Sequence, residues 1–375
     1  MSTYTAEQRA WAYLARVAEP PCGSVRLLVE EIGVVDAARA VCAQMLPPGY
    51  DEVTELTRAR AGSDFTTSDL DAAARIGARL VTPDDAEWPG WALMALAQAD
   101  TAERGGPPLV LWARGPATLD AISDSAVALV GSRAATSYGE YVASSLSAGI
   151  VGADRAVISG GAYGIDGVAH RSALASGGTT AAVLACGIDR DYPAGHAQLL
   201  AQIATSGVII SEYPPGTTAA KHRFLTRNRL VAALSSGVVV VEAGRRSGAA
   251  NTAAWARKLG RPLGAVPGPV TSAMSVGCHR MIGDGLATLV TTASEVLSLV
   301  TPDGAGGPND SPTRSTDALT PLQKRVHDAI PGRGTATVEE IAFSSAVDLS
   351  AVRSALAAMD VAGLVTPHDG GWKLL

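Results

Sequence analysis

The sequence predicts an α/β protein built on a doubly wound parallel sheet, with a small helical domain before it and a winged-helix domain after it. The main observation is an alternation that starts at Ala126. Short apolar runs, such as VALVGS at 127–132 and GVVVVEA at 237–243, alternate with helical stretches. Continuous Val, Ile and Ala runs indicate strands buried on both faces. Strand–helix alternation favours right-handed crossovers and a parallel sheet.

The pattern divides the chain into four parts. Residues 1–75 carry apolar residues at helical spacing, which predicts a small helical domain. Residues 76–300 form the α/β domain. Residues 301–318, TPDGAGGPNDSPTRSTDA, contain no large apolar side chain and are expected to be a flexible linker. Residues 319–375 hold three helical segments and a hairpin-like turn, which suggest a winged helix.

Within the α/β domain, strand-like runs occur in order. The expected strands are ARLVT, PPLVLWARG, VALVGS, AVISGG, TTAAVLAC, GVIISE, GVVVVEA, PLGAVPG and ATLVTT. In a doubly wound sheet the ligand lies at the carboxyl ends of the strands. Those ends are rich in Gly, Ser and charged residues, as a ligand-binding rim would be.

The composition excludes several classes of protein. The 375 residues include 36 acids and 30 bases, for a formal net charge of −6, and only 18% are charged, so the chain is globular. No apolar run approaches the roughly 18 residues of a membrane span, and no signal-peptide core begins the chain. We therefore expect a cytoplasmic protein with no membrane partner. The four cysteines form no CxxC pair, which argues against a disulfide scaffold and a metal site.

The net charge conceals an uneven distribution. Residues 1–125 carry 10 bases and 18 acids, residues 126–300 carry 14 and 9, and residues 301–375 carry 6 and 9. A basic middle between acidic ends is compatible with an anionic ligand. The alternative is that this uneven distribution of charge arose by chance.

Two strand ends carry glycine-rich turns. Gly131-Ser132-Arg133 could hold a phosphate through backbone amides and the arginine fork, or it could be a tight turn with a solvated arginine. Gly160 and Gly161 open the second turn, GGAYGID. This turn is not G-x-G-x-x-G, and the chain contains no G-x-x-x-x-G-K-[ST], so neither a dinucleotide nor a P-loop site is expected. No cofactor is predicted.

The segment KHRFLTRNR at 221–229 has four fixed positive charges and no acid. Basic side chains neutralise phosphates, and an aromatic ring can stack a base. The alternative is a solvated helix start with a buried phenylalanine. The candidate nucleic-acid-binding residues here are Lys221, Phe224, Arg227, Asn228 and Arg229.

The segment EAGRRSGAANT at 242–252 also ends a strand and starts a helix. Gly244 and Gly248 allow close backbone approach, while Arg245 and Arg246 add charge. Glu242 could bind a ribose, although a structural carboxylate is the favoured interpretation.

Few residues resemble a catalytic group. Asp166 and His170 lie four apart, so they share a helix face and could form an acid–base pair. Capping and orienting a helix is the more common role of such a pair. Cys186 and Cys278 are expected to be buried and structural.

Taken together, the motifs resemble those of the DNA-processing protein A (DprA/Smf) family of bacterial transformation proteins. The matching runs are VGSR at 130–133, SGGAYGIDGVAH at 159–170, CGIDRDYP at 186–193, SEYPPGT at 211–217, RFLTRNRLVAALS at 223–235, VVEAGRRSGAANTA at 240–253, AVPGPV at 265–270 and GCHRMIGDG at 277–285, together with Ser137-x-Gly139. They cover residues 76–300 densely and in order. The helical N-terminus, expected to be SAM-like or helix-hairpin-helix-like, and the winged C-terminus fit the accessory domains of that family.

The resemblance implies an extended Rossmann fold that binds single-stranded DNA without sequence specificity. It also implies a non-enzymatic recombination mediator in DNA uptake and transformation, a homodimer formed through the Rossmann domain, and RecA as a partner to be loaded onto DNA. By motif match, the DNA-binding residues would include Gly131, Ser132, Arg133, Gly160, Gly161, Ser211, Lys221, Phe224, Arg227 and Asn228.

Three positions depart from the usual pattern of the family. Tyr163 stands where Arg is usual, Leu225 where Pro is usual, and Ala249-Ala250-Asn251 where Ser-Leu-Ile/Thr is usual. The winged module also departs from a DNA reader. Residues 319–375 hold 5 bases and 6 acids, and the recognition helix carries only Arg353. We therefore expect that module to contact protein or to bind DNA weakly.

Two other functions remain as alternatives. The same Rossmann subclass resembles nucleoside-monophosphate phosphoribohydrolases, but this chain has no PGGxGTxxE motif, and Glu242 is the nearest analogue. A nicotinamide-dependent oxidoreductase lacks its fingerprint here.

Overall fold

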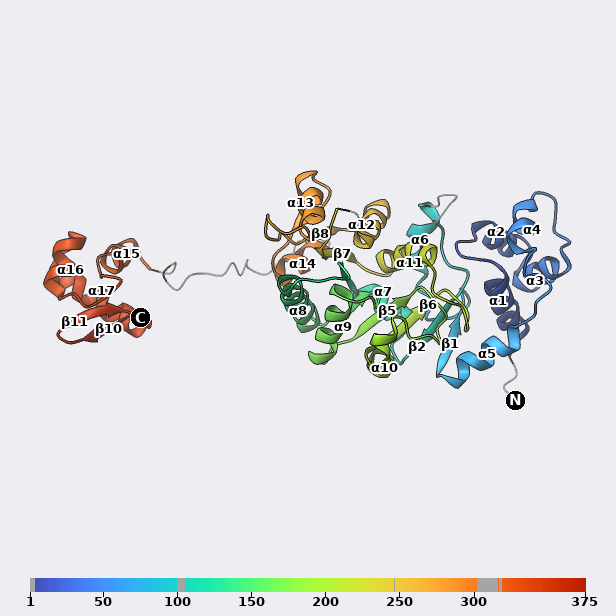
Figure 1. Cartoon of the computed structure of the whole chain (residues 1–375), viewed down its shortest axis with the longest axis horizontal. Helices are drawn as coiled ribbons and strands as arrows, with labels where there is room; N and C mark the ends of the chain where they lie inside the picture. Colours follow the sequence, from blue (N-terminus) through green and yellow to red (C-terminus); the bar gives the residue numbers. More distant parts are fainter. Residues whose placement is uncertain (1–3, 100–104, 246, 302–315, 317–318) are drawn as a thin grey trace. The chain divides into compact units, whose positions relative to one another are not determined.

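The computed structural model describes residues 4–99, 105–245, 247–301, 316 and 319–375. The chain forms two compact units, Met1–Gly307 and Pro308–Leu375, each with its own core (Figure 1).

A nine-stranded sheet forms the centre of the first unit, in the order β1-β2-β6-β5-β4-β3-β7-β8-β9. The seven strands from β6 to β9 run parallel, as predicted, whereas β1 and β2 form an antiparallel edge. Such an edge is common on otherwise parallel sheets. The strands are β1 (Ala78–Val81), β2 (Leu111–Arg114), β3 (Val127–Gly131), β4 (Val157–Ser159), β5 (Thr180–Leu184), β6 (Val208–Ser211), β7 (Gly237–Glu242), β8 (Leu263–Ala265) and β9 (Thr288–Leu289).

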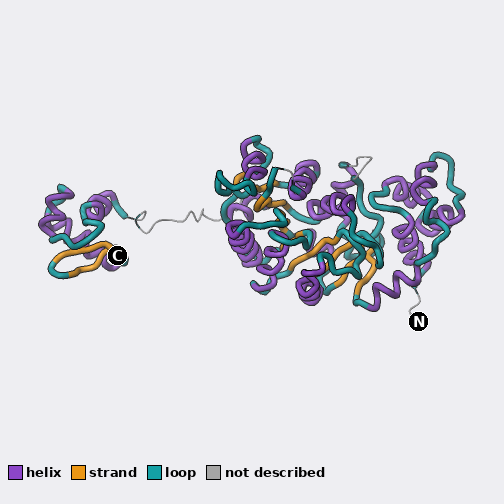
Figure 2. Tube along the Cα trace, viewed as in Figure 1, coloured by secondary structure: helices purple, strands orange, loops and turns teal. Residues whose placement is uncertain are grey.

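Helices cover both faces of this sheet, because alternate strand residues point to opposite sides. Ala128 and Val130 pack with one group of helices, and Val127 and Leu129 pack with the other. The first group is α6 (Gly90–Gln98), α7 (Leu119–Ser125), α11 (Lys221–Ala233), α12 (Gly248–Lys258) and α13 (Val276–Gly283). The second is α8 (Ser137–Gly152), α9 (Ile165–Ala175), α10 (Ala197–Ser206) with the short η1 (Ala194–His196), and α14 (Ala293–Val300). This doubly wound arrangement confirms the predicted fold class (Figure 2).

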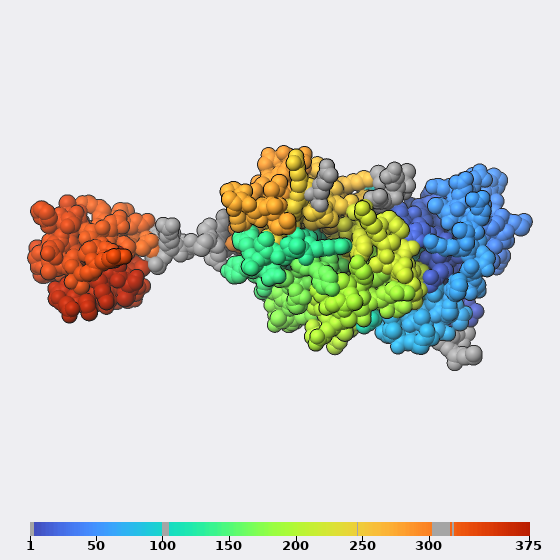
Figure 3. Space-filling view, viewed as in Figure 1, coloured from blue at the N-terminus to red at the C-terminus, as the bar shows by residue number. Residues whose placement is uncertain are grey.

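Five N-terminal helices pack against the β1–β2 side of the sheet. They are α1 (Ala6–Val17), α2 (Gly23–Ile32), α3 (Val34–Ala43), α4 (Asp51–Thr57) and α5 (Thr66–Arg75). Trp11 and Leu14 of α1 share one buried cluster with Trp112 of β2 and Leu200 of α10. The N-terminal helices therefore share a continuous core with the sheet. The space-filling view shows the N-terminal part of the chain packed directly against the rest of the first unit (Figure 3).

The C-terminal unit has the winged-helix arrangement expected from the sequence. Helices α15 (Pro321–Asp328), α16 (Val338–Ser345) and α17 (Leu349–Val361) precede a two-stranded sheet of β10 (Val365–His368) and β11 (Gly371–Leu374). Ala336, between α15 and α16, bridges to Trp372 and adds a short third strand position. In the described part of the chain, no single helix has the length and apolar character to cross a membrane; the bent pair α16–α17 meets that test only when taken together.

Candidate nucleic-acid interface

The strand order reverses beside β3. From β3 the chain proceeds to β4, β5 and β6 on one side, then returns to place β7 on the other side. Ligands of open α/β sheets bind at such a reversal, outside the carboxyl ends of the strands. A cavity of about 770 Å³ lies there. This strand-end cavity is lined by residues that include Gly131, Ser132, Arg133, Gly160, Asp166, Tyr192, Lys221, Phe224, Arg227, Asn228, Gly248 and Met274.

The loop after β3 is locked against the start of α9. The amide of Ile165 donates to the carbonyl of Ser132 at 3.1 Å. Gly131 permits this contact, since a Cβ there would lie 2.5 Å from the Ile165 side chain. The loop thus presents Arg133 over the cavity in a fixed position.

Glu242 holds the other end of the same loop. Its carboxylate accepts hydrogen bonds from the Thr136 amide at 3.0 Å and from the Thr136 hydroxyl at 2.5 Å. Thr136 in turn caps α8 by accepting from the Gly139 amide, and a Cβ at Gly139 would collide with Glu242. Glu242 is almost fully buried and acts as a structural carboxylate.

Two aromatic rings and two cations form the mouth of the cavity. The Arg133 guanidinium lies 4.9 Å from the centre of the Phe224 ring, and Phe224 lies 5.4 Å from the Tyr192 ring. Lys221, three residues before Phe224 on α11, is exposed and lines the same cavity. The mouth therefore combines aromatic faces with positive charge.

Arg227 forms part of the cavity floor. Its guanidinium donates to the carbonyl of Gly160 at 2.6 Å and to that of Val183, at the ends of β4 and β5. Burial lowers the pKa of Arg227, while the nearby charge of Asp166 opposes this. Asn228 accepts from Arg227 at 3.2 Å and donates to Asn251 at 3.1 Å, which ties α11 to α12.

Asp166 fills the amide cradle at the start of α9. Its carboxylate accepts from the amides of Gly160 at 3.1 Å and Ala162 at 3.4 Å. Burial raises the pKa of this carboxyl group. The Asp166 carboxylate therefore occupies the position at these amides that an anionic ligand would need.

Asp166 and His170 each form hydrogen bonds with other partners in the structure. His170 is fully buried, and its Nδ1 lies 2.7 Å from the Thr180 hydroxyl. Burial lowers the pKa of His170 to about 3. Each residue thus has its own structural partners, and the hypothesis of a catalytic pair gains no geometric support.

Several residues predicted from the sequence lie outside the cavity lining. Arg229 is fully buried in a two-pronged ion pair with Glu212, at 2.7 and 2.9 Å. Ser211 is also fully buried and donates to the Cys186 carbonyl at 2.6 Å. The polar groups of both residues are engaged inside the fold, and neither residue is among those that line the cavity.

Of the remaining glycine and arginine candidates, those that the structure describes are not among the residues that line the cavity. Gly161 is buried behind the cavity wall, where its carbonyl lies 3.1 Å from His196 Nδ1. Arg245 is exposed but is not among the lining residues. Arg246 lies outside the described residues. Tyr163, at the position of the usual arginine, packs edge-on against His196 at 4.8 Å and does not line the cavity.

The count of basic residues in α11 overstated the available charge. Arg229 is paired with Glu212, Arg223 with Glu19, and Arg227 is bonded to backbone carbonyls. Among the described residues that line the cavity, Lys221 and Arg133 are the exposed cations. Sequence reasoning missed Tyr192 and Met274 as lining residues; an aromatic residue soon after the β5 strand end was the available signal for Tyr192.

The two cysteines beside these strand ends are buried thiols. Burial raises the pKa of Cys186 and of Cys278 to about 11. Cys22 is buried as well, and Cys42 is exposed. Neither Cys186 nor Cys278 is a thiolate at neutral pH, in line with the structural role expected.

The fold and cavity define a class: a Rossmann-like α/β protein whose strand-end cavity presents cations and aromatic rings. The family model described as DNA recombination-mediator protein A matches residues 79–301. A putative DNA processing protein DprA of Mycobacterium tuberculosis is 52% identical over 98% of this chain and 94% of its own length. The chain belongs to the DNA recombination-mediator protein A family.

More distant relatives agree. Protein Smf of Escherichia coli is 34% identical over 68% of this chain and 70% of its own length. The X-ray structure of DprA from Streptococcus pneumoniae superposes with a TM-score of 0.61 at 28% identity, covering 79% of this chain and 98% of that one. DprA from Helicobacter pylori, whose structure describes a single-stranded DNA binding mode, has a TM-score of 0.51 at 26% identity and covers 60% and 96%.

Proposed function

We propose that the chain binds single-stranded DNA at the strand-end cavity and acts as a recombination mediator. The observation that carries the proposal is the mouth of the cavity, where Arg133 lies over Phe224 and Lys221 stands beside it. Cations neutralise backbone phosphates, and an aromatic face stacks unpaired bases. The single-stranded DNA binding mode described for the Helicobacter pylori relative supports the same ligand.

Binding is expected to be independent of sequence. Backbone contacts from Arg133, Lys221 and the Gly131-Ser132 amides carry no base information, and stacking on Phe224 accepts any base. Gly160, Arg227 and Asn228 shape the floor and wall that these groups rest on.

Family membership supports the wider role. We propose that the protein acts in DNA uptake and transformation, loads RecA onto the bound strand, forms a homodimer through the α/β domain, and works in the cytoplasm. In this proposal residues 1–75 and 319–375 are accessory domains joined to residues 76–300, the latter through 301–318. The exposed face of α17 carries one cation, Arg353, which favours a protein contact over duplex reading.

We propose no catalytic activity. The nucleotide-hydrolase alternative needs a carboxylate free to meet a ribose, and Glu242 is engaged with Thr136. Incubation with AMP is expected to release no adenine; release that disappears in Glu242→Gln would establish the alternative instead.

The decisive experiment is a fluorescence-anisotropy titration of labelled oligo-dT at several salt concentrations. We expect salt-dependent binding that Arg133→Ala and Lys221→Ala each weaken, with the salt slope falling by about 0.7 per lost phosphate contact. Arg280→Ala, an exposed cation on α13, serves as the control. Loss of binding should also abolish RecA loading. Wild-type protein that shows no affinity for oligo-dT would refute the proposal.

A further inference from the structure

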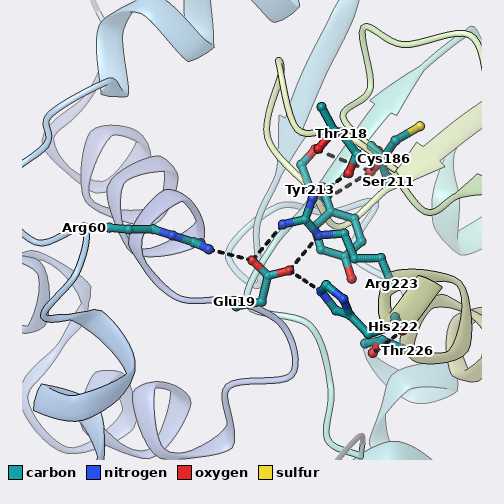
Figure 4. Close-up of polar contacts among 9 residues, drawn as sticks. All are labelled: Glu19, Arg60, Cys186, Ser211, Tyr213, Thr218, His222, Arg223 and Thr226. Carbon is teal, nitrogen blue, oxygen red and sulfur yellow. Dashed lines mark hydrogen bonds and ion pairs between the residues drawn. The ribbon is translucent and has the colours of Figure 1, made fainter. Parts of the chain in front are cut away.

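A carboxylate from the N-terminal helices reaches the first turn of α11. Glu19, just after α1, accepts from Arg223 Nε at 2.7 Å and Nη2 at 3.0 Å, and from Arg60 at 2.9 Å. His222 Nε2 lies 3.3 Å from the same carboxylate. Figure 4 shows Glu19 at the centre of these three side chains. Burial alone would raise the pKa of Glu19, but the hydrogen bonds from Arg223 and Arg60 outweigh burial and lower it to about 2.

Arg223 links Glu19 to the loop between β6 and α11. Its third guanidinium nitrogen donates to the Thr218 carbonyl, and the guanidinium lies 5.2 Å from the Tyr213 ring. A second tie comes from Arg16 of α1, which donates to the Pro215 carbonyl at 2.7 Å. The loop that leads into α11 is thus held by side chains of the N-terminal helices.

The same turn of α11 supplies the mouth of the strand-end cavity. Lys221 and Phe224 line that cavity, whereas Arg223 lines a separate cavity of about 330 Å³ shared with Glu19 and Arg60. Only 13% of the Arg223 side chain is exposed. Arg223 is therefore turned away from the mouth, with its donors already in use.

We propose that Glu19 is a positioning residue for single-stranded DNA binding: by fixing Arg223, it sets the first turn of α11 so that Lys221 and Phe224 face the ligand. The inference rests on the proposed function. In this proposal the N-terminal helices support DNA binding indirectly, because none of their residues is among those that line the strand-end cavity. Removing the carboxylate leaves a poorly exposed guanidinium without its counter-ion, which must turn toward water and release Thr218.

The opposite role is also testable. If Glu19 only withheld positive charge from DNA, its removal would free Arg223 and His222, raise affinity and steepen the salt dependence. Positioning predicts lower affinity with a salt slope no steeper than that of the wild type, because displacing Lys221 can remove a phosphate contact but adds none.

The experiment measures oligo-dT affinity of the full chain for Glu19→Gln, Glu19→Ala, Arg223→Gln and the double variant Glu19→Gln/Arg223→Gln. Each single change is expected to weaken binding about three- to tenfold, as the loss of one partly buried ion pair would, and the double variant should be no weaker than the singles. Arg39→Gln removes the cation of an exposed ion pair with Asp36 on α3, outside the Glu19 cluster, and is the matched control, with affinity unchanged.

Hydrogen–deuterium exchange distinguishes a local positioning role of Glu19 from a general contribution to stability. We expect faster exchange confined to residues 214–226 in Glu19→Gln, with the sheet unchanged. Higher affinity, a steeper salt slope, or additive losses in the double variant would overturn the inference. Uniformly faster exchange would assign Glu19 to general stability and would also overturn it. Wild-type protein that does not bind oligo-dT refutes the proposed function itself, so the two failures are distinguishable.

Discussion

The guanidinium of Arg227 occupies the space that a side chain at Gly160 would need. It donates to the Gly160 carbonyl at 2.6 Å, and a Cβ on Gly160 would lie 2.3 Å from one of its nitrogens. The Arg227 guanidinium can therefore form the floor of the strand-end cavity only because residue 160 has no side chain.

Gly160→Ala is expected to displace Arg227 from its two backbone carbonyls. We expect a loss of about 1–3 kcal/mol in the free energy of unfolding, the usual cost of overpacking, together with weaker oligo-dT binding. Denaturant titration and anisotropy measure the two effects. Gly152→Ala, on α8 with open space around the position, is the matched control and should change neither.

Phe224→Ala is expected to remove a stacking surface without removing a phosphate contact. The binding free energy should fall by about 1–3 kcal/mol per base stacked on the ring, while the slope of affinity against salt stays that of the wild type. Tyr141→Ala removes an exposed ring from α8 outside the cavity lining and should leave affinity unchanged. A changed slope in Phe224→Ala would mean that the ring acts by holding Arg133.

Arg229→Met is expected to destabilise the protein rather than weaken DNA binding directly. It leaves Glu212 buried and unpaired, which costs about 3–5 kcal/mol of unfolding free energy. The double variant Arg229→Met/Glu212→Leu should recover most of this loss, since it removes both charges. Oligo-dT affinity measured well below the unfolding transition should match the wild type; a tenfold loss there would return Arg229 to the binding site.

His170 is expected to make stability fall in acid. Its pKa is about 3 in the folded protein against 6.5 unfolded. Between these values the unfolded chain binds a proton that the folded chain does not, so the unfolding free energy drops as pH falls below about 6.5, by up to about 1.4 kcal/mol per pH unit. Denaturant titrations at pH 7, 6 and 5 should show a shallower pH dependence for His170→Gln. Equal slopes would contradict the assigned pKa.

The sequence predicted the fold well because the apolar strand runs and the turns that end them are both local signals. Runs such as VALVG are apolar throughout and indicate buried parallel strands, and the turn at Gly131 marks where one of them ends. The parallel order also places these ends on one edge of the sheet, so the mouth formed by Arg133, Lys221 and Phe224 could be anticipated.

Other features depend on distant partners that local patterns do not reveal. Nothing around Arg223 indicates that a carboxylate 204 positions earlier will bind it. Arg229 meets Glu212, 17 positions away, only because the fold brings α11 beside the residue that follows β6. A run of cations in sequence is therefore an upper bound on the charge that a surface offers to its ligand.

That internal pairing has a kinetic consequence. An overall charge of −6, with Arg133 and Lys221 as the exposed cations among the described lining residues, gives little long-range attraction for a polyanion. We therefore expect association at the roughly 10⁵–10⁷ M⁻¹s⁻¹ of encounters limited by orientation, not the faster rates of electrostatic steering. Such a protein selects its ligand after the first encounter. We expect similar association rate constants for duplex and single-stranded nucleic acids, whereas the dissociation rate depends on whether an unpaired base can stack on Phe224.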